Sequence, residues 1–468
     1  MTVPRDLERY RPLVDDWPAF VTALSRPLPR CVRVHPRRIA AGELETLLAE
    51  DGMQPRPLEW TDGAFRLGRS EGLGRRWWYL AGLCHSQEEA SMLPVRLLDP
   101  QPGERVLDLC AAPGSKTAQI ALALEGEGTV VANDSSVTRL RALRTTLDRL
   151  GLVNVSVTRR EGSVYPRGCG SFDRILVDAP CTGDGTSRRR PAARRAGLDR
   201  DYTELQKRLL RRAVRLCRPG GRIVYSTCSF APEENEMVVD AILGEGLTLV
   251  ASEVAGLKTA PGVTSWLGAE LHPELRHAVR LWPHHNDTGG FFVAVLEKSQ
   301  GPLAEADPPL SLAAAPSDEW HAAVGEWFGI DDEIWRRFSV HRSSARRLHL
   351  VNRGHAAPAN PVPDSVGLPF LKTGHRYPKL STAAALLLAG SAGRNVVELE
   401  PDQVAAYHEG STFAIDPAQT RTCTATGYVI ARHRGHGLGV ALHDNDAGTL
   451  RSLFAARWRG GSRRPQED

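Results

Sequence analysis

The sequence lacks the features that mark several large classes of protein. None of its eight cysteines forms a Cys-x-x-Cys pair, so zinc-ribbon and redox-motif readings have no support. No apolar run approaches the roughly 20 residues of a membrane span. The first residues also lack the apolar segment of a signal peptide. We therefore expect a cytoplasmic protein whose scattered cysteines are free thiols.

Lysine is scarce, because only six of the 59 basic residues are Lys and the net charge is +4. A GC-rich genome and selection for phosphate binding both explain such a bias towards arginine. The densest cluster, Arg188 to Arg190 with Arg194 and Arg195, lies shortly after Cys181. Two interpretations stay open for it, a solvated loop and a contact with nucleic acid.

The length of 468 residues allows two or three domains, and 41% hydrophobic with 24% charged residues is ordinary for a globular protein. Changes in composition and pattern suggest five segments. They are an N-terminal α+β extension (1–85), a catalytic domain (86–298), a linker with helices (299–370), a small α+β domain (371–458) and a disordered tail (459–468).

Short apolar runs alternate with helical patterns through the middle of the chain. Strands are predicted at 105–109, 129–132, 153–158, 174–177, 222–225 and 291–296. Helices are predicted at 87–98, 116–124, 136–150, about 205–216 and 233–243, and Pro219-Gly220-Gly221 is expected to end the fourth. This alternation predicts the α/β class with a doubly wound, Rossmann-like parallel sheet.

The patterns that predict helices and strands are weaker at the two ends of the chain. The N-terminal segment has helical stretches at 17–24 and 44–48 and an extended stretch at 31–34. The segment from 371 has a predicted helix at 381–388 and predicted strands near 395–399 and 428–432. We expect both ends to be small α+β units.

The loop after the first predicted strand carries small residues before a helix. It matches neither the Gly-x-Gly-x-x-Gly fingerprint nor a P-loop. A helix N-terminus still offers free N–H groups to a carboxylate. Asp134 ends the second strand, where it could bind ribose hydroxyls, and Glu161 follows the third, where it could accept from an adenine amino group. Each acid alone is typical of an ordinary strand end, but together they favour a binding site for S-adenosylmethionine.

Two cysteines follow predicted strands, Cys181 in Asp178-Ala-Pro-Cys and Cys228 in Ser226-Thr-Cys-Ser. The carboxyl ends of parallel strands line one crevice, so both thiols should face one pocket. Core burial is the alternative, but prolines and small polar neighbours argue against it. Methylation of cytosine C5 needs a thiolate at C6 and a base for the C5 proton. Asp178 adds a carboxyl group, and Lys116 could orient it or favour a thiolate.

Three segments resemble the signature motifs of the Sun/Nop RNA (cytosine-C5)-methyltransferase family. They are Leu109-Cys-Ala-Ala-Pro-Gly-Ser-Lys-Thr117, Asp178-Ala-Pro-Cys-Thr-Gly-Asp-Gly185 and Tyr225-Ser-Thr-Cys-Ser229. Glu233-Glu-Asn-Glu236 and Pro283-His-His-Asn-Asp-Thr-Gly-Gly-Phe-Phe292 are also similar to family segments, and the likeness covers residues 10 to 298.

The resemblance implies roles for individual residues. Cys228 would be the C6 nucleophile and Cys181 would assist proton removal and product release, with Asp178 and Lys116 as active-site partners. The residues implied to hold S-adenosylmethionine are Ala111, Ala112, Pro113, Gly114, Ser115, Lys116, Thr117, Asp134, Glu161 and Asp178. Glu161 departs from the family, which usually has Asp there.

The C-terminal segment, with Tyr377 to Ser381 and Gly427-Tyr428, resembles the PUA-like RNA-binding domain of some family members. That likeness implies structured RNA as the partner, read by shape and backbone while one unstacked base enters the pocket. The N-terminal extension is likewise expected to bind RNA. His284 and His285 receive no metal role, because nothing near them in the sequence supplies further ligands at suitable spacing.

The sequence therefore predicts an S-adenosylmethionine-dependent RNA methyltransferase that forms 5-methylcytosine. Ribosomal RNA of the small subunit is the preferred substrate, either naked or within an assembling subunit. A tRNA cytosine-C5 methyltransferase and a non-catalytic RNA-binding or ribosome-assembly factor on the same scaffold are the alternatives. DNA methylation is disfavoured, because those enzymes take their nucleophile from the Pro-Cys motif alone.

Overall fold

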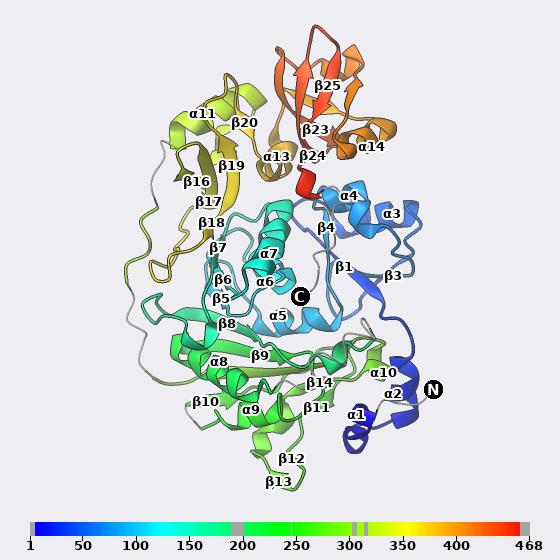
Figure 1. Ribbon diagram of the computed structural model, residues 1–468, viewed down its shortest axis with the longest axis vertical. Helices are drawn as coiled ribbons and strands as arrows, with labels where there is room; N and C mark the ends of the chain where they lie inside the picture. Colours follow the sequence, from blue (N-terminus) through cyan, green and yellow to red (C-terminus); the bar gives the residue numbers. More distant parts are fainter. Residues whose placement is uncertain (1–4, 189–200, 245, 302–306, 313–316, 459–468) are drawn as a thin grey trace.

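A computed structural model describes residues 5–188, 201–244, 246–301, 307–312 and 317–458 (Figure 1). A ten-stranded sheet forms the middle of the molecule, and smaller sheets stand at either end of the chain. Within the described residues, no helix combines the length and apolar character that crossing a bilayer requires. The predicted tail, 459–468, falls outside these ranges.

Five parallel strands form the centre of the large sheet, in the order β9-β8-β5-β6-β7. They are β5 (Arg105–Asp108), β6 (Thr129–Asn133), β7 (Val155–Thr158), β8 (Phe172–Asp178) and β9 (Cys217–Thr227). Helices cover both faces of this sheet, which explains why its strands are continuous apolar runs in the sequence. The chain runs outward from β5 to β7 and then crosses to β8, so a topological switch point lies between β5 and β8. The predicted α/β class is confirmed.

Helices cover the two faces of this sheet. They are α5 (Leu93–Leu98), α6 (Ser115–Ala123), α7 (Val137–Leu150), α8 (Thr203–Leu216) and α9 (Glu236–Asp240). Helices α5 and α9 are shorter than predicted, and a 3-10 turn, Ala90–Met92, precedes α5. Pro219 to Gly221 do not cap α8 as expected; they form an irregular stretch inside β9, where the ladder with β8 shifts register. Proline has no N–H for the ladder, so it fits only at such an irregularity.

Antiparallel strands extend the sheet at both edges. β15 (Phe291–Lys298) pairs with β9 and carries β14 (Val279–Leu281) and β10 (Leu247–Leu249), and β11 (Ala260–Pro261) follows β14. A short hairpin of β12 (Ser265–Trp266) and β13 (Ala269–Glu270) projects beyond them. At the opposite edge, β18 (Ser365–Val366) pairs with β7, so a distant part of the chain completes the sheet.

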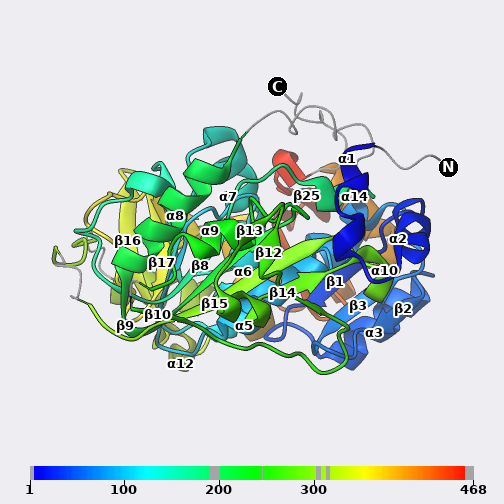
Figure 2. The same ribbon diagram turned by 90° about the horizontal axis from the view of Figure 1, so that it is seen from below.

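The N-terminal extension forms a four-stranded sheet in the order β2-β3-β1-β4. Its strands are β1 (Arg30–Val34), β2 (Pro55–Pro57), β3 (Ala64–Leu67) and β4 (Cys84–Ser86), and its further helices are α3 (Ala41–Glu50) and α4 (Trp77–Leu80). Before it, α1 (Arg5–Glu8) and α2 (Trp17–Leu24) reach the central domain, where α2 lies beside α10 (Pro283–Asn286) (Figure 2). Phe20 packs there edge-on against Trp282.

The segment expected to be a linker with helices contains strands as well. After α11 (Ser317–Phe328) and α12 (Asp332–Trp335) come β16 (Phe338–Ser344), β17 (Arg347–Asn352) and β19 (Leu368–Lys372). With β20 (Lys379–Leu380) they form a four-stranded sheet. Histidine, arginine and serine interrupt the apolar residues of β16 and β17, which hid the strand pattern in the sequence.

The last sheet has five strands in the order β21-β23-β24-β25-β22. They are β21 (Val396–Glu398), β22 (Thr412–Ala414), β23 (Gly427–His433), β24 (His436–Asp444) and β25 (Thr449–Ser452), accompanied by α13 (Thr382–Leu388) and α14 (Pro401–Glu409). Phe370 of the preceding sheet and Ile430 of this one belong to one buried apolar cluster. The two C-terminal sheets are therefore packed against a common core.

A buried ion pair fastens α9 to β14. Arg280 Nε donates to Glu236 Oε1 at 2.6 Å, and Arg280 Nη1 donates to the Phe230 carbonyl at 2.8 Å. The exposed fractions of the two charged side chains are 3% and 0%. Removal of one partner would leave a buried charge without compensation.

Arg280→Ala is expected to lower the free energy of unfolding by about 3–5 kcal/mol, because it leaves Glu236 buried and unpaired. Urea unfolding of both proteins measures the change. Arg336→Ala is the control, since Arg336 pairs with Glu333 on the surface and such pairs contribute about 0–1 kcal/mol. Equal effects of the two substitutions would contradict the assignment.

Candidate active site

A cavity of about 880 Å³ opens at the carboxyl edge of the central sheet, beside the switch point. Asp108 and Asp178 stand at the ends of β5 and β8 and line it, together with the loops that follow the strands. The N-terminal extension closes another side with Pro27 to Cys31 and Ser86 to Glu88. A cavity of this size can enclose a small molecule together with a further group.

The structure brings the two predicted thiols together in this cavity. The Sγ atoms of Cys181 and Cys228 lie 3.4 Å apart, within hydrogen-bonding range for sulfur. Both residues are partly exposed. The hydrogen bond with Cys228, and after it burial, raises the pKa of Cys181 well above its ordinary value. The raised pKa favours the protonated form of the Cys181 thiol.

Backbone contacts and one buried carboxylate fix the two cysteine loops. Glu234 accepts from the N–H of Thr182 at 3.1 Å and from its hydroxyl at 2.6 Å. The N–H of Gly185 donates to the Cys228 carbonyl at 3.0 Å, and the N–H of Gly290 donates to the Gly185 carbonyl at 2.9 Å. A Cβ at Gly185 would lie 2.6 Å from the Gly290 carbonyl oxygen and 2.7 Å from the Cys228 carbonyl oxygen. Only glycine allows the three loops to approach this closely.

Lys116 and Asp178 form an ion pair at the floor of the cavity. Lys116 Nζ donates to Asp178 Oδ2 at 2.8 Å, and Ser226 Oγ donates to Oδ1 at 2.8 Å. Burial alone would lower the pKa of Lys116, but the nearby acids, with Asp178 first, outweigh it and raise that pKa. Lys116 is therefore a fixed cation, with Asp178 holding it in place.

The loop from Ala111 to Lys116 lines the cavity ahead of α6. Gly114 is the N-cap of that helix, with φ of +110°. A Cβ there would lie 2.6 Å from Leu143 Cδ1, so the loop depends on glycine. Thr117 does not line the cavity, in contrast to the other residues expected to hold the cofactor. Its hydroxyl instead donates to Asp108 at 2.7 Å.

The two acids expected to hold a nucleoside also face the cavity. The buried Asp134 carboxylate accepts from the N–H of Ala112 at 3.3 Å and lies 3.2 Å from Arg139. Glu161 accepts from the Ser163 hydroxyl at 2.5 Å. These contacts orient both carboxylates at the ends of β6 and β7.

Asp108 is a cavity residue that the sequence analysis missed. Its side chain is 1% exposed, and its Oδ1 has no hydrogen-bond partner among the described residues. Burial raises its pKa to about 7, and Asp178 adds to the effect. Its position at a strand end, like that of Asp178, was the available signal. Gln87 and Glu88 were also missed, and no motif marks them.

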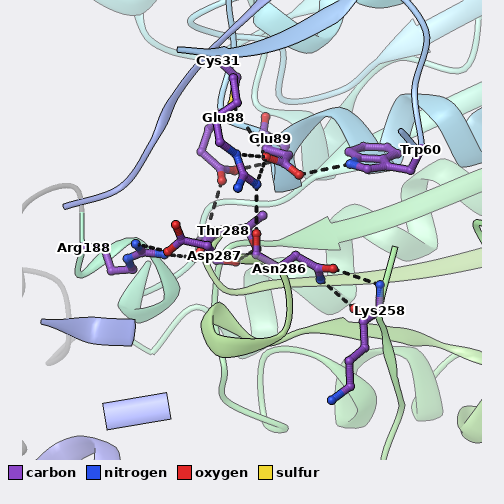
Figure 3. A network of polar contacts seen from close by, with 12 residues as sticks. Cys31, Trp60, Glu88, Glu89, Arg188, Lys258, Asn286, Asp287 and Thr288 are labelled. Atoms are coloured by element: carbon purple, nitrogen blue, oxygen red, sulfur yellow. Dashed lines mark hydrogen bonds and ion pairs between the residues drawn. The ribbon is translucent and has the colours of Figure 1, made fainter. Parts of the chain in front are cut away.

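Arg188 has a structural role, unlike the solvated or nucleic-acid-binding role considered for its cluster. Its side chain is 0% exposed and donates to Asp287 Oδ1 at 2.6 Å and to the Thr288 carbonyl at 2.9 Å (Figure 3). The N–H of the next residue, Gly289, donates to Glu88 at 3.1 Å. This network ties the catalytic loops to the N-terminal extension. Arg189, Arg190, Arg194 and Arg195 lie outside the described residues.

A third possible metal ligand lies near His284 and His285 in space, although the sequence places it far from them. Their Nε2 atoms lie 2.7 Å and 2.9 Å from Asp15 Oδ1, which belongs to the distant N-terminal segment. Burial lowers the pKa of His285. Hydrogen bonds between the imidazole rings and the carboxylate account for this cluster, and we assign it no metal.

Comparisons with known proteins agree on one family. The profile described as 16S rRNA methyltransferase RsmB/F matches residues 95–297, and the profile described as Methyltransferase RsmF PUA domain matches residues 394–460. A ribosomal RNA small subunit methyltransferase F from Aeromonas hydrophila is 32% identical over 454 residues, covering 90% of this chain and 89% of that protein.

Archaeal proteins match a little less than two thirds of the chain. A tRNA (cytosine(49)-C(5))-methyltransferase from Pyrococcus abyssi is 37% identical over 297 residues, which cover 62% of this chain and 95% of that protein. The crystal structure of a methyltransferase homologue from Pyrococcus horikoshii superposes with a TM-score of 0.55 at 35% identity, covering 64% of this chain and all of the other. The chain therefore belongs to the RsmB/F family of RNA (cytosine-C5)-methyltransferases and carries the PUA domain of its RsmF members.

Proposed function

We propose that this enzyme forms 5-methylcytosine in ribosomal RNA of the small subunit, with S-adenosylmethionine as methyl donor and Cys228 as nucleophile. One observation carries the proposal, the 3.4 Å separation of two thiols inside a cavity at the switch point of the sheet. A cytosine ring at that place would meet both sulfurs, a lysine cation and a candidate cofactor site. A cytoplasmic location fits this substrate.

The extent of the similarity favours ribosomal RNA over tRNA. The Aeromonas hydrophila protein, named for small-subunit ribosomal RNA, aligns over 454 residues and so includes the C-terminal sheets. The Pyrococcus abyssi protein, named for tRNA, aligns over only 297 residues. Its higher identity of 37% keeps tRNA as the second candidate. The assembling subunit is the proposed form of the substrate, because accessory domains suit recognition of a structured particle.

The residues at the cavity fit S-adenosylmethionine. The N-terminus of α6 offers N–H groups to the cofactor carboxylate, and the unpaired, buried oxygen of Asp108 can accept from its ammonium group. Asp134 and Glu161 stand at successive strand ends for the ribose and the adenine. When bound, the cofactor supplies an electrophilic methyl group on a sulfonium.

The chain's own groups supply the remaining chemistry. Cys228 adds to cytosine C6, and the electron pair of the C5–C6 double bond then makes C5 nucleophilic towards the methyl group. The C5 proton then passes to solvent, and Cys181, which lies beside the same ring, assists its removal. The S–C6 bond then breaks, the double bond returns, and the Cys228 thiolate is restored. Lys116, held by Asp178, places a positive charge beside the ring.

Cys228→Ala should reduce transfer of labelled methyl to RNA by about three orders of magnitude or more, because the nucleophile is lost. Filter-bound radioactivity from labelled S-adenosylmethionine measures the rate. Cys423→Ala is the matched control, since this free cysteine lies in the C-terminal unit, away from the cavity. Full activity of Cys228→Ala would reject the assignment.

Cys181→Ala should trap a covalent complex with RNA, since addition to C6 proceeds while release is impaired. Denaturing gel electrophoresis of the variant with substrate RNA and S-adenosylmethionine would show a band of slower mobility. The double variant Cys181→Ala/Cys228→Ala should give none, because it has no nucleophile. A failure of the single variant to accumulate an adduct would refute the role of Cys181.

Deletion of the gene should remove 5-methylcytosine at one or a few positions in small-subunit ribosomal RNA, because the intact enzyme is proposed as the source of those marks. Bisulfite sequencing of total RNA from the parent and deletion strains measures this, with complementation by Cys228→Ala as the control. Loss of 5-methylcytosine only at tRNA positions would favour tRNA as the substrate. Unchanged cytosine methylation would favour a non-catalytic RNA-binding or assembly factor.

A further inference from the structure

A second cavity lies at the joint between the two C-terminal sheets, at the end of the molecule that carries β20 and β23 (Figure 1). It has a volume of about 400 Å³, and we call it the aromatic pocket. Its lining residues are His375, Arg376, Tyr377, Ala425, Thr426, Gly427, Tyr428 and Leu442. The segment matched by the PUA profile begins at residue 394, so the pocket arises only where the preceding unit packs against that domain.

Tyr377 and Tyr428 line this pocket, and Trp327 packs against Tyr377. Trp327 and Tyr377 stack with centroids 4.2 Å apart and planes 24° from parallel. Trp327 Nε1 donates to the Tyr428 carbonyl at 2.9 Å, which fixes the stack on β23. A Cβ at Gly427 would lie 2.8 Å from Trp327 and 3.2 Å from Tyr377. Glycine therefore lets both rings lie flat against the strand, while Tyr377 and Tyr428 stay partly exposed.

Uncompensated positive charge surrounds the rings. Lys372 and Lys379 are two of only six lysines in the chain, and the pairing of β19 with β20 sets them directly opposite one another. Like charges in that position destabilise a sheet. Lys379 Nζ lies 5.1 Å from the Tyr428 centroid, and the guanidinium of Arg376 lies 5.2 Å from that of Tyr377. Among the described residues, none of these three cations has an ion-pair partner within 4.0 Å.

We propose that the aromatic pocket binds an unpaired base of the substrate RNA, stacked on Tyr377 beside Tyr428, with the adjoining phosphates on Arg376, Lys372 and Lys379. The inference rests on the proposed RNA substrate and adds a second contact outside the catalytic cavity. Every base has a face that stacks on an aromatic ring, and a basic rim follows the backbone of a single strand. The pocket is large enough for one nucleoside, and a duplex has no free base to insert.

Photo-crosslinking tests the proposal with the full chain and a single-stranded oligoribonucleotide of about eight nucleotides that contains 5-iodouridine. The expected product is a crosslinked peptide that contains Tyr377 or Tyr428, identified by mass spectrometry. Tyr377→Ala should weaken binding of a fluorescent copy about ten-fold, because one stacked base is lost. Tyr377→Phe keeps the ring and should bind like the parent. A duplex of equal length should compete poorly.

Charge reversal provides a matched pair of variants. Arg376→Glu should weaken binding and reduce its dependence on salt, since a phosphate contact is removed. Arg336→Glu reverses an exposed arginine outside the pocket and should have little effect. Thermal melting and S-adenosylmethionine binding of every variant show that the fold and the catalytic cavity are intact.

Equal binding by the Tyr377→Ala and parent chains would overturn the proposal and leave the pocket as a surface for a protein partner. The test uses no methyl transfer, so it separates the two proposals. A chain that methylates no cytosine yet shows Tyr377-dependent crosslinking would refute the proposed function alone. Normal methylation with no effect of Tyr377→Ala on binding or crosslinking would refute the aromatic pocket alone.

Discussion

The parallel pairing of β8 with β9 is the constraint on which the catalytic site depends. Its register sets Asp178 opposite Ser226, so the turns that follow the two strands begin side by side. Cys181 and Cys228 come three and two residues later, and their sulfurs meet at 3.4 Å. Gly185 then lets the two turns contact each other through the backbone. Strand pairing therefore delivers two reactive groups that lie 47 residues apart in the sequence.

Residues far from the motifs complete the cavity. Glu88 of the N-terminal extension binds the N–H of Gly289, and Arg188 joins that loop through Asp287 and Thr288. The same logic applies at the other end of the molecule, where α11 and β20 bring Trp327 and Tyr377 onto β23. In both places the cavity is formed by residues of two structural units rather than of one. A unit taken alone would lose it.

Much of the fold could be predicted because the buried parallel strands are continuous apolar runs, which leave a clear signal in the sequence. Strands β16 and β17 escaped prediction, since polar residues interrupt their pattern. Arg188 looked like part of a solvated cluster, but its carbonyl and carboxylate partners lie about 100 residues or more away in the sequence. The contact of Asp15 with His284 could not be predicted either, because the two residues lie far apart in the sequence.

The sequence by itself determined the chemistry that is available, because motif residues such as Cys181, Cys228, Lys116 and Asp178 follow predictable strand ends. Only the tertiary structure decided how those groups are used. It paired Lys116 with Asp178, left one oxygen of Asp108 without a partner among the described residues and turned Thr117 away from the cavity. Local patterns encode secondary structure, whereas contacts between distant residues depend on how the elements pack.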